Sequence, residues 1–263
     1  MRLTLLGTGT SFGVPQIGCR CAVCRSTDPR DRRTRTAALL QADRGAEGVS
    51  LLIDTPPELR LQLLGAGVTR IDAVLYTHEH SDHVSGIDDL RVFSVLTGKP
   101  VPLYGTPATL GFLRESYRYI FDPAVVEFAG TAKPRLTLNP LQAGVPEAIE
   151  GHRVLPLGFG HGHGTVLGFR IGRLGYVTDA KEVGGPERDL LRGVDVLVLN
   201  ALWWKPHPTH LSIPEAIETA QAIGARRTIL THLSHQTGHS ELALRLPPGL
   251  EPGYDGQVVE ILE

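Results

Sequence analysis

The stretch Ile71-Asp72-Ala73-Val74-Leu75-Tyr76-Thr77-His78-Glu79-His80-Ser81-Asp82-His83 passes from a short apolar run into a segment with three histidines and an aspartate. The run Ile71 to Tyr76 predicts a buried strand. Imidazoles suit zinc, iron and manganese, and carboxylates suit the harder ions. The alternative is a polar loop that is rich in histidine by chance, but the chain of 263 residues has only 11 histidines. The stretch therefore predicts a metal site at the end of a strand.

The composition is that of an ordinary globular protein. Hydrophobic residues make up 41% and charged residues 21% of the chain, and the formal net charge is −2. This charge favours neither nucleic acid nor an anionic membrane as a partner. No run approaches the roughly 18 apolar residues of a membrane span, and the segment Met1 to Gly7 lacks the pattern of a secretory signal. We expect one domain over residues 1–263, located in the cytoplasm.

All three cysteines lie close together, in Cys19-Arg20-Cys21-Ala22-Val23-Cys24. An odd number of tightly clustered cysteines is a poor basis for disulfides and a good basis for a metal clip. Free thiols without a metal are the alternative, because the spacing lacks the paired C-x-x-C units of a strong zinc signature.

Periodicity and turn residues predict the secondary structure. Strands are expected at 2–6, 37–41, 50–53, 71–76, 101–104, 154–157, 166–171, 175–177, 194–199, 228–230 and 258–262. The early strands are expected to form an antiparallel meander with a turn at 43–48. Helices are expected at 56–64, 86–96, 107–119 and 213–223, the last opened by a capping box from Ser212 to Glu215. Residues 122–153 are expected to be irregular.

Candidate metal ligands follow predicted strands in four places, at His78, His161, Asp179 and His232. A sheet holds such residues in fixed positions, and the loops that carry them can converge at one rim. The pattern therefore predicts that these four residues share one site.

The motif from His78 to His83 resembles the H-x-H-x-D-H signature of the metallo-β-lactamase superfamily, and the later candidates follow in the same order. The resemblance implies an α/β fold, a four-layer αββα sandwich of two mixed sheets flanked by helices. It also implies two divalent ions. One would be bound by His78, His80 and His161, the other by Asp82, His83 and His232, and Asp179 would bridge them. His163 competes with His161, which we prefer because Gly168-Phe169 follows it at the usual family spacing.

Three further segments resemble the PhnP-type branch of this superfamily, namely residues 7–11, 18–24 and 230–235. That branch contains phosphodiesterases that open small cyclic phosphates, including phosphoribosyl cyclic phosphate. It also has a structural zinc, which the resemblance places on Cys19, Cys21, Cys24 and His235. Three thiolates and one imidazole make a closed tetrahedral site, which stabilises a loop and does no chemistry.

These features predict a dinuclear metal-dependent phosphodiesterase. Water shared by two ions ionises near neutral pH and can attack phosphorus. Asp82 and His210 are the expected catalytic residues. His210, which aligns with a catalytic histidine of the PhnP-type branch, would protonate the leaving alkoxide, and His207 is the alternative donor. The donors fit zinc, manganese or iron in the active site.

Several residues have two possible roles. Asp54 is expected either to orient a ligand imidazole or to serve in a turn. The arginines in 28–35 form either a solvated face or a phosphate contact. Trp203 and Trp204 wall the substrate pocket or seal a contact between two copies.

The expected partner is a small phosphodiester, without nucleic acid or membrane, and a homodimer is also considered. The other functions considered are a hydrolase of lactones or thioesters and a non-catalytic metal-binding scaffold.

Overall fold

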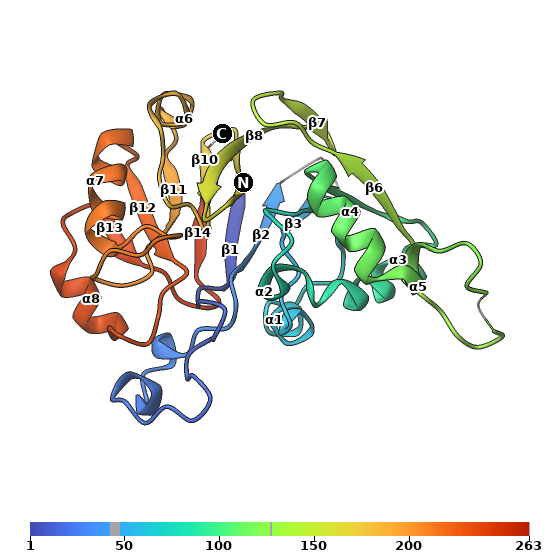
Figure 1. The fold of residues 1–263 in the computed structure, drawn as a ribbon, viewed down its shortest axis with the longest axis horizontal. Coiled ribbons are helices and arrows are strands. Elements are labelled where there is room, and N and C mark those ends of the chain that lie inside the picture. The colour runs from blue at the N-terminus through green and yellow to red at the C-terminus, as the bar shows by residue number, and fades with distance from the viewer. Residues whose placement is uncertain (43–47, 127, 263) are drawn as a thin grey trace.

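The computed structural model describes residues 1–42, 48–126 and 128–262. Two seven-stranded sheets face each other, and helices cover their outer faces (Figure 1). The space between the sheets is filled by apolar side chains from both, such as Leu3 and Leu75 from one sheet and Phe169 and Val198 from the other. Each sheet also has an apolar cluster between its outer face and the helices that cover it. This arrangement confirms the predicted four-layer αββα sandwich.

The first sheet has the strand order β14-β1-β2-β3-β4-β5-β6. Its strands are β1 (Arg2–Gly7), β2 (Ala37–Ala42), β3 (Val49–Ile53), β4 (Ala73–Leu75), β5 (Val101–Gly105), β6 (Leu136–Pro140) and β14 (Val258–Glu260). β14, β1, β2 and β3 pair antiparallel, as the predicted meander requires, whereas β3 to β6 run parallel. The turn expected at 43–48 lies outside the described residues except for Gly48.

The second sheet has the order β13-β12-β11-β10-β9-β8-β7. Its strands are β7 (Glu147–Ile149), β8 (His152–His161), β9 (Gly164–Ile171), β10 (Leu174–Val177), β11 (Val196–Asn200), β12 (Arg227–Thr231) and β13 (Leu250–Pro252). β7 to β10 pair antiparallel and β10 to β13 parallel. The carboxyl ends of β10, β11 and β12 therefore meet at one edge of the sheet.

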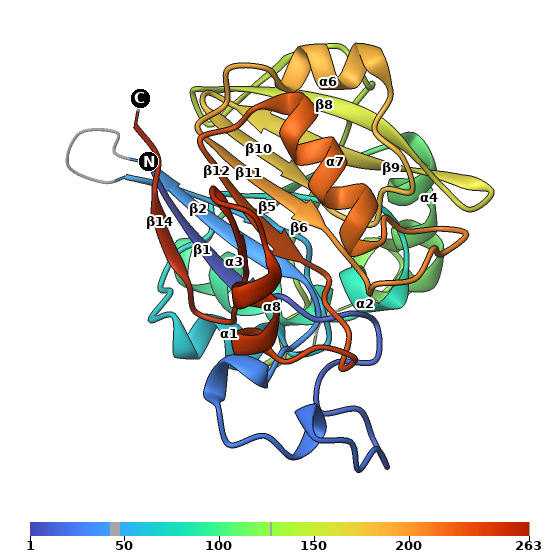
Figure 2. The ribbon, with the colours of Figure 1, turned by 90° about the vertical axis from the view of Figure 1, so that its left-hand side faces the viewer.

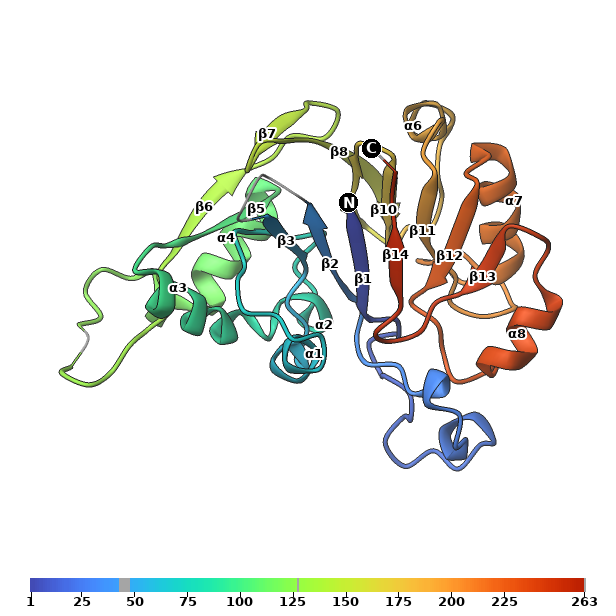
Figure 3. The same cartoon turned by 180° about the vertical axis from the view of Figure 1, so that it is seen from behind.

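The helices divide between the two outer faces (Figure 3). The first sheet carries α1 (Leu59–Gly65), α2 (Ser81–Val84), α3 (Arg91–Thr97), α4 (Pro107–Ser116) and α5 (Arg118–Phe121). The second carries α6 (Gly185–Leu191), α7 (Ile213–Ile223) and α8 (His239–Arg245). Short 3-10 helices lie at Val23–Arg25, Pro29–Asp31 and Ile87–Leu90. No helix in the described ranges is long and apolar enough to cross a membrane.

The two ends of the molecule differ in character (Figure 2). Both termini lie at one end, where the start of β1 pairs with β14. At the other end, the segment between β1 and β2, which carries the cysteines, extends away from the sheets (Figure 2).

Most elements match the sequence predictions, and the differences have local causes. The helix at 213–223 is confirmed with its capping box, in which the Ser212 hydroxyl and the Glu215 carboxylate each bind the other's backbone amide. The helix expected at 107–119 is interrupted at Tyr117, whose φ of −112° and ψ of 44° are not helical. The helix expected at 86–96 begins with a 3-10 turn.

The prediction that residues 122–153 are irregular is wrong. β6, β7 and the first residues of β8 lie in this range. β6 includes Asn139 and Pro140, and none of its residues is buried. Such residues have low strand propensity and occur at sheet edges, where β6 and β7 both lie.

Candidate metal centre

The loops that follow four strands bring imidazoles and carboxylates to one rim of the sandwich. His78 follows β4, His161 ends β8, Asp179 follows β10 and His232 follows β12. The ring centroids of His78 and His161 lie 5.3 Å apart, although the two residues are on different sheets. The structure therefore brings together the four strand-end residues that the sequence singled out.

Three histidines form the first set of donors. One ring nitrogen from each of His78, His80 and His161 lies within 4.8 Å of the others. His161 Nδ1 is 3.0 Å from the carbonyl oxygen of Thr209, so this nitrogen donates a hydrogen bond and leaves Nε2 free to bind a metal. His163 is exposed in the turn between β8 and β9 and is absent from the set. This geometry favours His161 over His163.

The second set of donors is centred on Asp179. Its Oδ2 lies 3.1 Å from His83 Nε2, and its Oδ1 lies 3.1 Å from His232 Nε2. Asp82 Oδ2 is 3.4 Å from His83 Nε2. The two oxygens of Asp179 face different histidines, and Asp179 belongs to two of the donor groups, one with His78 and His83 and one with His210 and His232.

Buried hydrogen bonds fix the orientation of two of the imidazoles. Asp54 is completely buried and accepts from His83 Nδ1 at 2.7 Å, and from the amide and hydroxyl of Thr77 at 2.8 Å. The Thr36 hydroxyl lies 3.4 Å from His232 Nδ1 and donates to the Gly9 carbonyl, so it can accept from the ring. Both contacts leave Nε2 for a metal, which is how proteins orient ligating histidines. Asp54 thus takes the orienting role that the sequence left open.

The donor set fits a divalent cation. His83 Nε2 is buried and has no hydrogen-bond partner of good geometry within the described residues. A buried polar atom without a partner is costly unless another group, such as an ion, satisfies it. Carboxylate oxygens of Asp82 and Asp179 lie near this atom, and His78 groups with it as a possible ligand. Carboxylates and imidazoles are the donors that hydrolytic metal centres use.

Burial and charge adjust the protonation of these groups. Burial lowers the pKa of His78 well below its usual value and that of His232 to about 4. Burial alone would raise the pKa of Asp179, but the imidazoles of His232 and His83 hold it well below its usual range. Burial alone would lower the pKa of His83, but the carboxylates of Asp179 and Asp54 raise it well above its usual value. A cation bound here would compete with protons for these ring nitrogens, so metal binding should weaken as pH falls.

Backbone conformation in the site is unusual. Among the described residues other than glycine, positive φ occurs at Asp54 (63°), Asp179 (58°), His232 (56°) and Glu150 (49°). This region is rarely adopted by residues with a side chain and costs about 1–3 kcal/mol per residue. Three of these four residues belong to the metal site or directly support it.

His210 lies within reach of the same carboxylate. Its Nε2 is 2.9 Å from Asp179 Oδ1, and its Nδ1 is 2.7 Å from the Thr209 hydroxyl and 3.2 Å from His207 Nδ1. The ring also groups with Asp179 and His232 as a possible ligand. His207 is one step farther from Asp179, so the structure places His210, rather than His207, next to the reacting centre.

The cysteines form a separate site. Sγ of Cys19 and of Cys21 lie 3.3 and 3.4 Å from His235 Nδ1, and Cys24 completes the group. A backbone hydrogen bond from Cys24 is the main influence lowering the pKa of the Cys21 thiol, to about 6, whereas burial raises the pKa of Cys24 to about 11. None of the three is in a disulfide. The four donors suit the closed zinc site expected from the sequence.

The arginines of 28–35 divide between two environments: Arg30 and Arg32 are exposed, as the solvated alternative expects, whereas Arg33 is buried. Arg33 is 1% exposed and donates to the carbonyl oxygens of Ser234 (2.5 Å) and Thr237 (3.0 Å). Asp31 accepts from Arg33 at 3.4 Å and from the His239 amide at 2.6 Å. Arg33 therefore holds the loop that joins His232 to the cysteine site, a role that sequence reasoning missed.

The structure also shows what surrounds Trp203 and Trp204. The Trp204 indole donates to the Thr237 hydroxyl at 2.9 Å, and the Arg245 guanidinium lies 3.6 Å above its ring. Trp204 therefore packs within the molecule, against the apolar cluster of the second sheet. Trp203 lies against the ring of His207, with centroids 5.1 Å apart, which places it near the site.

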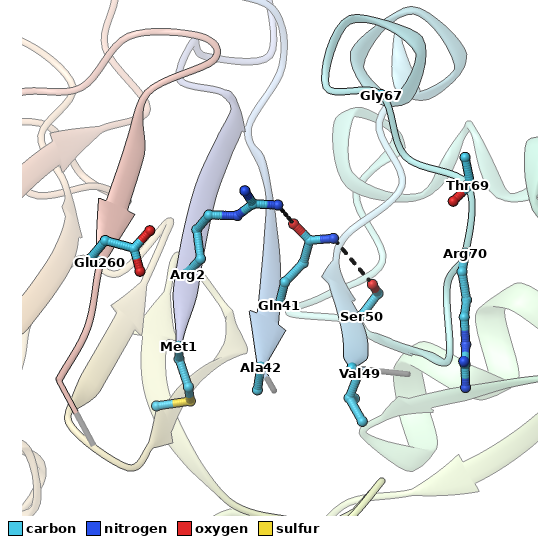
Figure 4. Close-up of a pocket in the computed structure, with 11 residues that line it drawn as sticks. Met1, Arg2, Gln41, Ala42, Val49, Ser50, Gly67, Thr69, Arg70 and Glu260 are labelled. Carbon is cyan, nitrogen blue, oxygen red and sulfur yellow. Dashed lines mark hydrogen bonds between the residues drawn. The ribbon is translucent and has the colours of Figure 1, made fainter. Parts of the chain in front are cut away.

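A polar hollow of about 530 Å³ lies at the other end of the first sheet, and Figure 4 shows the residues that line it. Arg2, Gln41 and Ser50 form a chain of hydrogen bonds across it. β1 begins here at Arg2, and β3 begins here at Val49 and ends at Ile53, one residue before Asp54 at the metal site. None of the residues that line the hollow belongs to the histidine cluster.

Known proteins resemble this chain over most of its length. Residues 50–233 match the family model of the β-lactamase superfamily domain. A protein of Porphyromonas gingivalis named octanoyltransferase is 40% identical over 97% of this chain, and the match spans 51% of that protein. Coenzyme PQQ synthesis protein B of Methylobacterium nodulans is 30% identical over 76% of this chain and 72% of its own length.

Solved structures extend the comparison. The crystal structure of a new diphosphatase from the PhnP family superposes with a TM-score of 0.89 and 38% identity, covering 98% of this chain and 97% of that one. The zinc-bound PqqB of Methylobacterium extorquens has a TM-score of 0.79 at 19% identity, covering 99% and 100%, a likeness of fold alone. The chain spans about half the length of the Porphyromonas protein, so that protein's name does not assign acyl transfer to the matched half.

Proposed function

We propose that this chain, which belongs to the metallo-β-lactamase superfamily and is similar to its PhnP branch, is a metal-dependent hydrolase that hydrolyses a small cyclic or diester phosphate. The observation that carries the proposal is Asp179, whose two oxygens face His83 on one side and His232 on the other. The likeness to a PhnP-family diphosphatase supports a phosphate ester as the substrate class.

Seven residues are proposed to hold two divalent ions in the active site: His78, His80, Asp82, His83, His161, Asp179 and His232. Such ions supply an ionised water and neutralise charge on phosphate oxygens. Zinc, manganese and iron all suit this donor set. A third ion, zinc, is proposed for Cys19, Cys21, Cys24 and His235.

The side chains around this centre have distinct roles. His210 is proposed to hold a proton at Nε2 beside Asp179 and to give it to the leaving oxygen. Thr209 and His207 contact its Nδ1 and keep the ring in place. Asp54 keeps His83 protonated at Nδ1, so that Nε2 faces the centre. Asp82 adds a carboxylate on the face beside His83.

A second candidate is a hydrolase of thioesters or lactones. It rests on the same donor centre, because a bound divalent ion would polarise the carbonyl of a thioester or lactone. The two candidates differ in the atom that is attacked, phosphorus or carbon, and a substrate panel separates them.

The experiment begins with metal analysis of protein purified without added metal. The panel then contains bis-p-nitrophenyl phosphate, a ribose cyclic phosphate, a diphosphate diester, a lactone and an octanoyl thioester. We expect turnover of phosphate esters, loss of activity and of exchangeable ions in Asp179→Asn, and neither loss in the exposed-site control His163→Ala. Rapid turnover of the thioester or lactone with inert phosphates would transfer the assignment to the second candidate.

A further inference from the structure

His207 and His210 are joined through Thr209 by hydrogen bonds whose direction is fixed at one end. The backbone amide of Thr209 donates to His207 Nδ1 at 3.3 Å. An amide can only donate, so this nitrogen carries a lone pair and the proton of the neutral His207 ring is on Nε2. Burial and the nearby charge of His210 lower the pKa of His207, which favours the neutral ring.

The remaining hydrogen bonds follow from that lone pair. The Thr209 hydroxyl is 3.2 Å from His207 Nδ1 and 2.7 Å from His210 Nδ1. A hydroxyl that donates its one proton to His207 accepts from His210, so His210 carries a proton on Nδ1. The two Nδ1 atoms are also 3.2 Å apart. The other tautomer of His210 would place two lone pairs against each other at that distance.

This arrangement decides which proton of His210 is mobile. Because the Nδ1 proton is bound by Thr209, a protonated His210 ring carries its second proton on Nε2, which is 2.9 Å from Asp179 Oδ1. Release of the Nε2 proton leaves the ring in the neutral tautomer that Thr209 already binds. The proton is therefore released toward the metal centre and not toward the loop.

Thr209 is itself held firmly. Its carbonyl oxygen accepts from His161 Nδ1 at 3.0 Å. A Cβ atom on Gly162 would lie 3.1 Å from the Thr209 methyl group, so this methyl packs closely against the backbone after His161. The loop that carries Thr209 is closed at its base, where the Leu202 amide donates to the Leu211 carbonyl at 2.9 Å. Thr209 thus contacts an expected metal ligand through its main chain and the expected acid through its hydroxyl.

We propose that Thr209 is a positioning residue whose hydroxyl, together with His207 Nδ1, fixes the tautomer of His210 so that Nε2 gives its proton to the leaving oxygen. The inference rests on the proposed function and adds the residues that select the donating atom. In this step the N–H bond at Nε2 breaks and its electron pair stays on the nitrogen. The oxygen leaves phosphorus with the electron pair of their bond and forms an O–H bond with the proton.

The kinetic test compares leaving groups. Thr209→Val removes the hydroxyl and keeps the shape of the side chain. With an alkyl phosphate diester we expect kcat to fall by about 10–100-fold, the scale of loss when a catalytic group is misplaced. The loss should be much smaller with p-nitrophenyl esters, because p-nitrophenolate leaves without a proton. Exchangeable metal should be retained, since the Thr209 carbonyl still holds His161.

Conservative variants supply the matched controls. Thr209→Ser restores the hydroxyl and should recover most of the turnover of the alkyl ester. His207→Asn places an oxygen acceptor near the position of Nδ1, whereas His207→Leu removes the acceptor. We therefore expect His207→Asn to be the more active of the two on the alkyl ester.

A second measurement does not depend on any substrate. In the zinc-loaded protein with nitrogen-15 in its histidines, two-bond proton–nitrogen correlations report the tautomer of each ring. We expect a proton on Nε2 of His207 and a proton on Nδ1 of His210. The signals of His207 are assigned by their absence from His207→Asn.

Two results would overturn the proposal. One is a proton on Nδ1 of His207 or none on Nδ1 of His210, because the hydrogen bonds would then run in the other direction. The other is a Thr209→Val variant that loses equal activity on both kinds of ester or that Thr209→Ser does not rescue. An unaltered protein that hydrolyses no phosphate ester would instead overturn the proposed function, and the tautomers would still decide whether Thr209 and His207 orient His210.

Discussion

Asp54 accepts a hydrogen bond from His83 Nδ1 at 2.7 Å, and both side chains are almost completely hidden from solvent. The same carboxylate binds the amide and hydroxyl of Thr77, the residue before His78. One buried aspartate, directly after β3, therefore orients both ends of the motif from His78 to His83.

Replacement of Asp54 should weaken metal binding more than it weakens the fold. Asp54→Ala removes the acceptor that holds His83, and loss of such a partner typically costs about 10–100-fold in metal affinity. Chelator competition measures this change. Asp195→Asn is the control, because Asp195 is also buried but pairs with Arg173 at the opposite end of the second sheet. Equal affinity in both variants would contradict the orienting role.

Replacement of His210 should affect the proton transfer and not the metal content. For an alkoxide leaving group, His210→Ala should lower kcat by about 10²–10⁴-fold, the usual contribution of a general acid. The loss should be much smaller for p-nitrophenyl esters, because p-nitrophenolate leaves without a proton. Metal content is measured in parallel with His163→Ala as the control. A loss of exchangeable metal from His210→Ala would make His210 a ligand, as its grouping with Asp179 and His232 also permits.

The cysteine site should hold one ion independently of the active site. Cys21→Ser should lower the chelator-resistant metal by about one ion per chain and lower the melting temperature, because metal binding contributes to folding stability. The ions removed by mild chelation should remain. Thiol titration with and without chelator provides a second measurement, since Cys19, Cys21 and Cys24 should react only after the metal is removed. Full reactivity before chelation would show that the thiols are free.

Arg33 should be essential for stability. Arg33→Met leaves Asp31 buried without its cation and removes the donors to the Ser234 and Thr237 carbonyls. Breaking a buried ion pair in this way costs about 3–5 kcal/mol in the free energy of unfolding, measured by urea denaturation. Arg30→Ala, which breaks the exposed pair with Asp28, should cost no more than about 1 kcal/mol. Similar costs for both variants would count against the buried role of Arg33.

Asp255 should make stability depend on pH in an unusual direction. It is buried, accepts from the amides and hydroxyls of Thr8 and Thr34, and burial raises its pKa to about 6. The folded chain therefore holds this proton more tightly than the unfolded chain, so the carboxyl's contribution to stability decreases as pH rises from about 4 to about 6.

Asp255→Asn does not titrate and supplies the reference. The stability of the unaltered protein relative to this variant should increase on going from pH 7 to pH 4.5, by at most about 3 kcal/mol for a shift from 3.8 to about 6. Urea denaturation at several pH values measures the difference. A difference that does not change with pH would contradict the raised pKa.

Local patterns predicted the elements that position the site. The capping box at Ser212 and Glu215 and the apolar run before His78 depend on neighbouring residues, so they are visible in sequence. The ligand positions could be proposed because each follows a strand, and strand ends of one sheet meet at a rim.

Other features depend on contacts between distant residues. Arg33 is buried only because Ser234 and Thr237, some 200 positions later, supply carbonyl oxygens. In sequence it is one of several arginines and resembles a solvated charge. β6 pairs with β5 through backbone hydrogen bonds that need no strong side-chain pattern, so its residues appeared irregular. The outward leucines of α1 could be separated from its inward leucines only after the helix was placed on the sheet.

The left-handed backbone at Asp54, Asp179 and His232 has an evolutionary consequence. Each of these positions requires two things at once. It needs a side chain that serves metal binding, and it needs a backbone conformation that most residues avoid. A descendant that no longer needed the metals would be released from this conflict. We would expect it to accumulate glycine or asparagine there, so that the loss of these three residues would mark relatives that had given up hydrolysis and become more stable.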